Sequence, residues 1–127
     1  VRERVPPKRV AELLADALDR YAAPVVYRVT PFRRFELPAE LLRVMSPSAE
    51  VKGHGPGQEV LQVGKREVRI SGLEPVGHYA LRLAFSDGHD TGLFAWDYLY
   101  QLGRDQQRLW AEYESKLAAA GASRDSA

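Results

Sequence analysis

Large apolar residues alternate with smaller or polar ones in the middle of the chain, a pattern typical of a half-buried strand. The alternating residues are Tyr79, Leu81, Leu83 and Phe85. The pattern ends at Asp87-Gly88, a dipeptide that favours tight turns because glycine readily adopts positive φ. Beyond Gly92 lies an aromatic run, Phe94, Trp96, Tyr98 and Tyr100. We expect these aromatic side chains to form core, with a polar turn over 87–92 between them and the strand.

Helical spacing of apolar residues marks both ends of the chain. Residues 8–22 carry one apolar stripe, made by Val10, Leu13, Leu14, Ala17, Leu18 and Tyr21. A second stripe after Asp105 consists of Leu109, Trp110, Tyr113 and Leu117. Both stripes fit the 3.6-residue period of a helix buried on one face. We expect residues 1–24 to be the least well packed part and residues 122–127 to fray.

Short β-prone and loop segments fill the space between these helices. Residues 25–29 and 32–37 read as strands, and residues 38–44 as a short helix that begins near Pro38. Residues 46–57 contain three glycines and two prolines, which excludes the interior of an element. Residues 59–64 and 67–73 predict a hairpin. Strands in the middle and helices at the ends predict an α+β domain with a mainly antiparallel sheet.

Length and composition restrict the class of protein. The chain has 127 residues, which suits one domain, and we assign residues 25–121 to it. Eighteen basic and seventeen acidic residues give a net charge of +1, so the strong positive field of a nucleic-acid-binding protein is absent. No apolar run is long enough to span a membrane, and no secretory signal is recognised. The absence of cysteine excludes a disulfide or thiolate-bound metal within this chain and fits a cytoplasmic location.

Two glycine-flanked loops carry the candidate chemistry. His54 lies in one loop and His89 in the other, and Glu50, Asp87 and Asp90 could complete a set of ligands for a divalent metal such as zinc or iron. A second interpretation gives these residues purely structural roles. In it, His89 bonds a neighbouring carboxylate or the turn backbone, His54 is a surface residue, and the aspartates serve the turn through their own hydrogen bonds.

The sequence gives little support to an enzyme. It contains no nucleophile elbow, phosphate-binding loop, dinucleotide fingerprint or zinc-protease motif. No pairing of a nucleophile with a base is evident from spacing alone. We therefore expect no catalytic residues.

Several motifs in fixed order resemble the gamma-butyrobetaine hydroxylase-like N-terminal domain family. They are Leu41-Leu42-Arg43-Val44, Ser46-Pro47-Ser48-Ala49-Glu50-Val51, Gly53-His54-Gly55, Val76-Gly77-His78-Tyr79-Ala80, Phe85-Ser86-Asp87-Gly88-His89-Asp90-Thr91-Gly92 and Trp96-Asp97-Tyr98-Leu99. The resemblance runs from about Phe35 to Asp125. Members of this family occur as small stand-alone bacterial proteins, as the N-terminal domain of dioxygenases, or fused to P-loop scaffold proteins that assemble iron–sulfur clusters.

The chain departs from the family pattern in two places. The resemblance makes His89 the counterpart of the histidine that, with three cysteines, binds a structural zinc in the dioxygenases. The corresponding loop around Ser46 to His54 has no thiol here, so the resemblance implies no Cys-ligated zinc or cluster. In most family members a hairpin with its own Asp-Gly turn precedes the position of Leu37. This chain lacks that Asp-Gly turn. The catalytic iron of the dioxygenases belongs to a separate domain, so the resemblance carries no hydroxylase activity to this chain.

These observations lead to one preferred hypothesis and two alternatives. The preferred one is a non-catalytic interaction module, associated through the resemblance with iron–sulfur or iron-dependent systems, which binds a protein partner and neither nucleic acid nor membrane. Its predicted interaction surface consists of Ser46, Ser48, His54, His89 and Thr91. The first alternative is a metal-binding domain built on His54 and His89, and the second is a free-standing enzyme. The preferred hypothesis requires the loop over 46–57 and the turn over 87–92 to meet in space.

Overall fold

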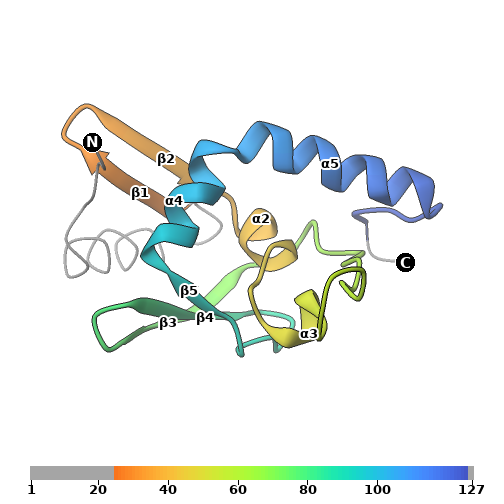
Figure 1. Cartoon of the computed structure of the whole chain (residues 1–127), viewed down its shortest axis with the longest axis horizontal. Coiled ribbons are helices and arrows are strands. Elements are labelled where there is room, and N and C mark those ends of the chain that lie inside the picture. The colour runs from red at the N-terminus through yellow and green to blue at the C-terminus, as the bar shows by residue number, and fades with distance from the viewer. Residues whose placement is uncertain (1–24, 126–127) are drawn as a thin grey trace.

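The computed structural model describes residues 25–125, which form a small mixed α+β domain (Figure 1). The elements, in chain order, are β1 (Val25–Thr30), β2 (Arg33–Leu37), α2 (Ala39–Val44), α3 (Ala49–Lys52), β3 (Ile70–Val76), β4 (Ala80–Phe85), β5 (Leu93–Ala95), α4 (Trp96–Arg104) and α5 (Gln106–Ala119). The predicted fold class is confirmed. The helix expected over 8–22 lies outside the described residues.

Both sheets in the described part are antiparallel. β1 pairs only with β2, with Tyr27 opposite Phe35 in the register, and the larger sheet has the order β3-β4-β5. In the larger sheet Leu73 lies opposite Leu83, and Leu81 lies opposite Phe94. The first hairpin therefore forms although the chain lacks the expected Asp-Gly turn. Its connection is Pro31-Phe32, which comes after a register shift between Arg28 and Thr30.

The hairpin expected over 59–73 does not form. Val60 instead donates its backbone N–H to Val51 of α3 at 2.8 Å, and Gly64 donates to Ser123 near the C-terminus at 2.9 Å. These long-range bonds use backbone groups that a local hairpin would need. β3 consequently begins only at Ile70 and pairs forward with β4.

The core lies on one face of the larger sheet. Leu81, Leu83 and Phe85 point into it from β4, and all three are buried, as the alternation predicted. Tyr79 does not follow the pattern: it belongs to the turn before β4 and is 59 % exposed. Helix α4 packs against β2 and β5 and contributes further buried leucines, Leu99 and Leu102. A smaller cluster, in which Val44 meets α5, contains Tyr113 and Leu117.

The segment just after α5 is held against the domain, although residues 122–127 were expected to fray. Arg124 donates two hydrogen bonds to the Glu40 carboxylate, at 2.7 and 2.8 Å, and its guanidinium lies 5.1 Å from the centre of the Trp110 ring. Arg66 donates its backbone N–H to the Arg124 carbonyl at 3.0 Å. The composition of the tail gave no sign of these contacts, because they depend on a carboxylate that lies 84 residues earlier.

No helix among residues 25–125 combines the length and the apolar character needed to cross a bilayer.

We expect Arg124→Ala to lower the free energy of unfolding by about 2–3 kcal/mol, because it leaves the buried Glu40 carboxylate without its bidentate partner. Urea denaturation monitored by tryptophan fluorescence measures the change. Arg108→Ala is the matched control: Arg108 pairs with Glu112 on the exposed face of α5, so its loss should leave the free energy of unfolding close to that of wild type. Equal losses for the two variants would show that the tail does not stabilise the domain.

Candidate functional site

His89 is fixed by the turn that follows β4. Gly88 has a φ of +90°, the conformation that the Asp87-Gly88 pair predicted. The turn is closed by backbone bonds from Gly88 to the Phe85 carbonyl at 2.9 Å and from Phe85 to the His89 carbonyl at 2.8 Å. The His89 ring lies 6.1 Å from the Phe85 ring, and the His89 side chain is only 3 % exposed. His89 is therefore part of the packed structure.

The loop after α2 and the short helix α3 each supply a partner for one imidazole nitrogen. Ser46 Oγ lies 2.8 Å from His89 Nε2, and Glu50 Oε2 lies 3.1 Å from His89 Nδ1. An ionised carboxylate can only accept, so Nδ1 carries the proton that is donated to Glu50. In the neutral ring Nε2 then accepts the Ser46 hydroxyl proton, and Ser46 Oγ accepts the backbone N–H of Ser48 at 3.3 Å. Every donor in this chain of bonds has an acceptor.

A second set of hydroxyl contacts joins the same two segments. Ser48 Oγ lies 2.7 Å from Thr91 Oγ1 and accepts the Glu50 backbone N–H at 3.2 Å, which caps the start of α3. Thr91 Oγ1 donates to Glu50 Oε1 at 3.2 Å. Since a hydroxyl has one proton, Ser48 must be the donor to Thr91. We call Ser46, Ser48, Glu50, His89 and Thr91 the loop–turn patch.

Close backbone packing seals the inner side of this patch. A Cβ atom added to Gly92 would lie 2.3 Å from Ser46 Oγ, so only glycine allows the turn to approach the loop this closely. Ser46 itself is fully buried. The outer side is open, because the Glu50 side chain is 64 % exposed and Thr91 is also exposed. The loop–turn patch therefore has a buried anchor and an accessible carboxylate edge.

Asp87 lies beside the patch and is held by two cations. Its Oδ2 accepts from Arg43 Nε at 2.8 Å and from Lys65 Nζ at 2.6 Å, while its Oδ1 accepts the His89 backbone N–H at 3.2 Å. Burial raises the pKa of Asp87, but the bonds from Lys65, Arg43 and His89 and the Arg43 charge outweigh burial and lower the pKa to about 2. Sequence spacing gave no signal for Arg43 or Lys65, which lie 44 and 22 residues away.

The predicted metal ligands do not converge. His54 is exposed in the loop after α3, and Asp90, in the turn between β4 and β5, lies 3.8 Å from Arg82. Of the five candidates only His89 and Glu50 are joined through their side chains, since Asp87 reaches only the backbone N–H of His89, and both ring nitrogens of His89 already have partners. Within residues 25–125 no group of three or more His, Cys, Asp or Glu side chains is placed to hold a metal ion. The residues present therefore do not fit the zinc that the family resemblance implies for dioxygenases.

The Ser46–His89–Glu50 chain has the order and the distances of a serine hydrolase triad, a pairing that sequence spacing did not reveal. Its accessibility is reversed. In a triad the nucleophile faces the substrate and the acid is buried, whereas here Ser46 is buried behind Gly92 and Glu50 faces solvent. A substrate carbonyl could not reach Ser46 Oγ without separating the loop from the turn. The geometry therefore favours a structural role for these three side chains.

Two aromatic residues, Phe94 and Tyr98, support the loop as part of the core. Phe94 is fully buried, and Tyr98 donates a hydrogen bond from its hydroxyl to the Met45 carbonyl. Burial raises the pKa of Tyr98 to about 12, so the hydroxyl stays protonated as a donor. Lys52 lies 5.5 Å above the Tyr98 ring. These contacts hold both ends of the segment 45–52 in place.

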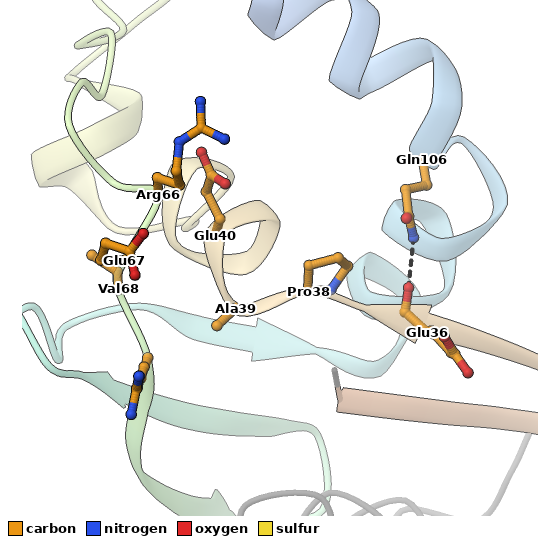
Figure 2. Close-up of a pocket in the computed structure, with 9 residues that line it drawn as sticks. Glu36, Pro38, Ala39, Glu40, Arg66, Glu67, Val68 and Gln106 are labelled. Atoms are coloured by element: carbon orange, nitrogen blue, oxygen red, sulfur yellow. Dashed lines mark hydrogen bonds between the residues drawn. The ribbon is translucent and has the colours of Figure 1, made fainter. Parts of the chain in front are cut away.

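A separate cleft of about 390 Å³ lies between α2 and the segment 66–69 (Figure 2). Glu40 and Arg66 occupy one side, and Gln106 on the other side donates to the Glu36 carbonyl at 2.8 Å. The two charged side chains already bind the tail: Glu40 pairs with Arg124 and Arg66 pairs with Asp125. None of the predicted site residues lines this cleft.

We expect Asp87→Asn to destabilise the domain at pH 7 by about 1–2 kcal/mol, after allowance for solvent screening at this turn. The folded-state pKa of Asp87 is depressed, so its contribution is present above the ordinary value of 3.8 and is lost as the pH falls towards 2. The difference between wild type and variant should therefore shrink between pH 4 and pH 2 in urea titrations.

Asp90→Asn provides the comparison for Asp87→Asn, because its side chain is 54 % exposed and its cation is 3.8 Å away. We expect a change below about 0.5 kcal/mol with no such pH dependence. An Asp87→Asn effect that stays constant down to pH 2 would contradict the role given to the two cations.

Comparisons with known proteins place the chain in a family. The family model described as "Gamma-butyrobetaine hydroxylase-like, N-terminal" matches residues 30–100. A protein solved by NMR in solution is 55 % identical, with 80 % of each chain covered and a TM-score of 0.70. A second NMR structure is 48 % identical over 81 % of this chain and 76 % of that one, with a TM-score of 0.67.

A crystal structure from Acidithiobacillus ferrooxidans, of a protein with unknown function in the DUF971 family, is 41 % identical over 56 % of this chain and 68 % of that one, with a TM-score of 0.45. No curated protein matches the chain. The family model covers more than half of the chain, and two solved relatives share about half of its residues over most of its length. The chain therefore belongs to the gamma-butyrobetaine hydroxylase-like N-terminal domain family.

Proposed function

We propose that this domain is a non-catalytic interaction module that presents the loop–turn patch to a protein partner. The observation that carries the proposal is the preorganised carboxylate edge. Glu50 is held by His89 and Thr91 yet keeps 64 % of its side chain exposed. A group already fixed in one position loses little conformational entropy when a partner binds it. The association with iron–sulfur or iron-dependent systems rests on the family resemblance alone.

A groove with both apolar and charged lining residues lies next to the loop and supports the same proposal. The groove has a volume of about 430 Å³ and lies between α3 with its following segment and the side of α5. Val51 and Tyr113 are among its apolar lining residues, and Val60 at its margin is 54 % exposed. Protein interfaces combine a central apolar contact with a polar rim. The groove and the carboxylate edge together provide both parts.

The position of Ser46 argues against a hydrolase as the alternative. Substrate access would require the bonds between the loop and the turn to break, and these bonds include the Ser48–Thr91 contact at 2.7 Å. A metal-binding function is likewise less well supported, because His89 would have to give up Ser46 or Glu50 to bind an ion. The interaction module needs neither rearrangement.

Reversing charge at the exposed edge tests the proposal. We expect the double variant Glu50→Lys/Asp90→Lys to lower retention of the partner at least about tenfold in a pull-down from the native host, because hot-spot losses exceed 1 kcal/mol. Retention is measured by quantitative mass spectrometry against wild type, with the thermal midpoint of each variant recorded.

The matched control is Glu67→Lys/Glu114→Lys, which makes the same charge change at exposed positions away from the loop–turn patch. It should retain the partner at the wild-type level. The proposal fails if wild type recovers no partner, or if both double variants recover it equally while remaining folded.

A further inference from the structure

The tip of the β1–β2 hairpin exposes a large aromatic side chain to solvent. Phe32 is 98 % exposed, whereas the next most exposed large apolar residue among the described ones, Tyr79, is 59 % exposed. Pro31 is exposed beside it, so the tip is apolar. A single exposed apolar residue on a flat surface is ordinary, but aromatic residues on protruding loops are common anchors in protein interfaces.

The tip is held in one conformation. Phe32 donates its backbone N–H to Thr30 Oγ1 at 3.2 Å, and Arg28 Nη1 donates to the Pro31 carbonyl at 3.3 Å. Behind the turn, Arg28 lies opposite Arg34 in the register. Figure 1 shows this hairpin projecting beyond α4, far along the long axis of the domain from α3. The tip is thus both prominent and preorganised, and it is separate from the loop–turn patch.

Arginine residues precede and follow the aromatic tip along the hairpin. The Arg33 guanidinium lies 5.4 Å from the Phe35 ring centre and 5.9 Å from that of Tyr100. Arg34 is 57 % exposed and lies 4.0 Å from Glu36, the acidic residue of the hairpin. Three arginines and one glutamate give the segment 25–37 a formal charge of +2, although the whole chain carries only +1. The hairpin is therefore a local cationic region.

We propose that the β1–β2 hairpin tip is a second protein-binding surface, whose partner has an apolar pocket rimmed by carboxylates. Phe32 fills the pocket and Arg34 meets the rim. The Arg34 side chain is 57 % exposed, and its planar set of donors suits bidentate bonds to fixed carboxylates. One aromatic ring gives a nucleic acid only a single stacking position and gives a membrane a single short anchor, so these occupants fit less well.

Photo-crosslinking from the tip tests this assignment in the full chain. Benzoylphenylalanine is incorporated in place of Phe32 in native host cells, and the adducts are mapped by mass spectrometry. We expect one dominant protein adduct at an apolar residue with Asp or Glu beside it. Adding Arg34→Glu should lower the adduct yield about tenfold or more, whereas benzoylphenylalanine in place of Tyr79 should not label that site.

Direct binding to the purified captured protein separates binding from folding. Phe32→Ser should weaken the complex at least about tenfold by calorimetry and leave the thermal midpoint unchanged, because Phe32 makes almost no buried contact. Adducts on lipid or nucleic acid, adducts scattered over many proteins, a yield independent of Arg34 or an unchanged affinity for Phe32→Ser would each overturn the proposal. Because Glu50→Lys/Asp90→Lys leaves the hairpin intact, it should retain this complex even if the loop–turn patch binds nothing.

Discussion

The carboxylate of Asp87 joins three parts of the chain that are far apart in sequence. It binds α2 through Arg43, the extended segment before β3 through Lys65, and its own turn through the backbone of His89. Two of these partners are cations, and the Arg43 side chain is almost fully buried. An arginine in that position requires a counter-charge, because an unpaired buried charge is strongly unfavourable. Asp87 therefore fixes where the turn lies relative to α2, and with it the position of His89.

The loop–turn patch adds a network of side-chain hydrogen bonds to this fixed point. Ser46 and Glu50 occupy the two nitrogens of His89, and Ser48 and Thr91 close the contact on the outside. Nearly all the donors and acceptors involved are satisfied by one another, which is how buried polar groups avoid a desolvation cost. A network saturated in this way holds the loop in shape. It is poorly suited to nucleophilic attack or metal binding, since either would remove a bond that the network uses.

The two proposed surfaces differ in charge and in location. The loop–turn patch presents the acidic side chain of Glu50 near a groove, and the hairpin, whose formal charge is positive, presents Phe32. They lie far apart along the long axis of the domain (Figure 1). Surfaces of opposite charge at separate positions could bind two different partners at the same time.

Local patterns in the sequence determined the strand β4, the Asp87-Gly88 turn, the stripe of α5 and the α+β class, because each depends on neighbours within a few residues. The family motifs identified the loop and the turn as regions of interest, including Ser46, Ser48, Glu50, His89 and Thr91. The tertiary structure alone decided which of these side chains meet. It joined Ser46 to His89 across 43 residues and left His54 at the surface.

Contacts between residues far apart in the sequence also explain the errors in the expected secondary structure. The segment 59–64 has the composition of a strand, but its backbone bonds to α3 and to the C-terminal tail replaced the local hairpin. The tail after α5 was expected to fray, yet Arg124 donates a hydrogen bond to the Glu40 carboxylate in the folded domain. Spacing along a chain specifies periodicity and turns. The partners of a charge or a backbone group that lie many residues away are specified only when packing brings them together.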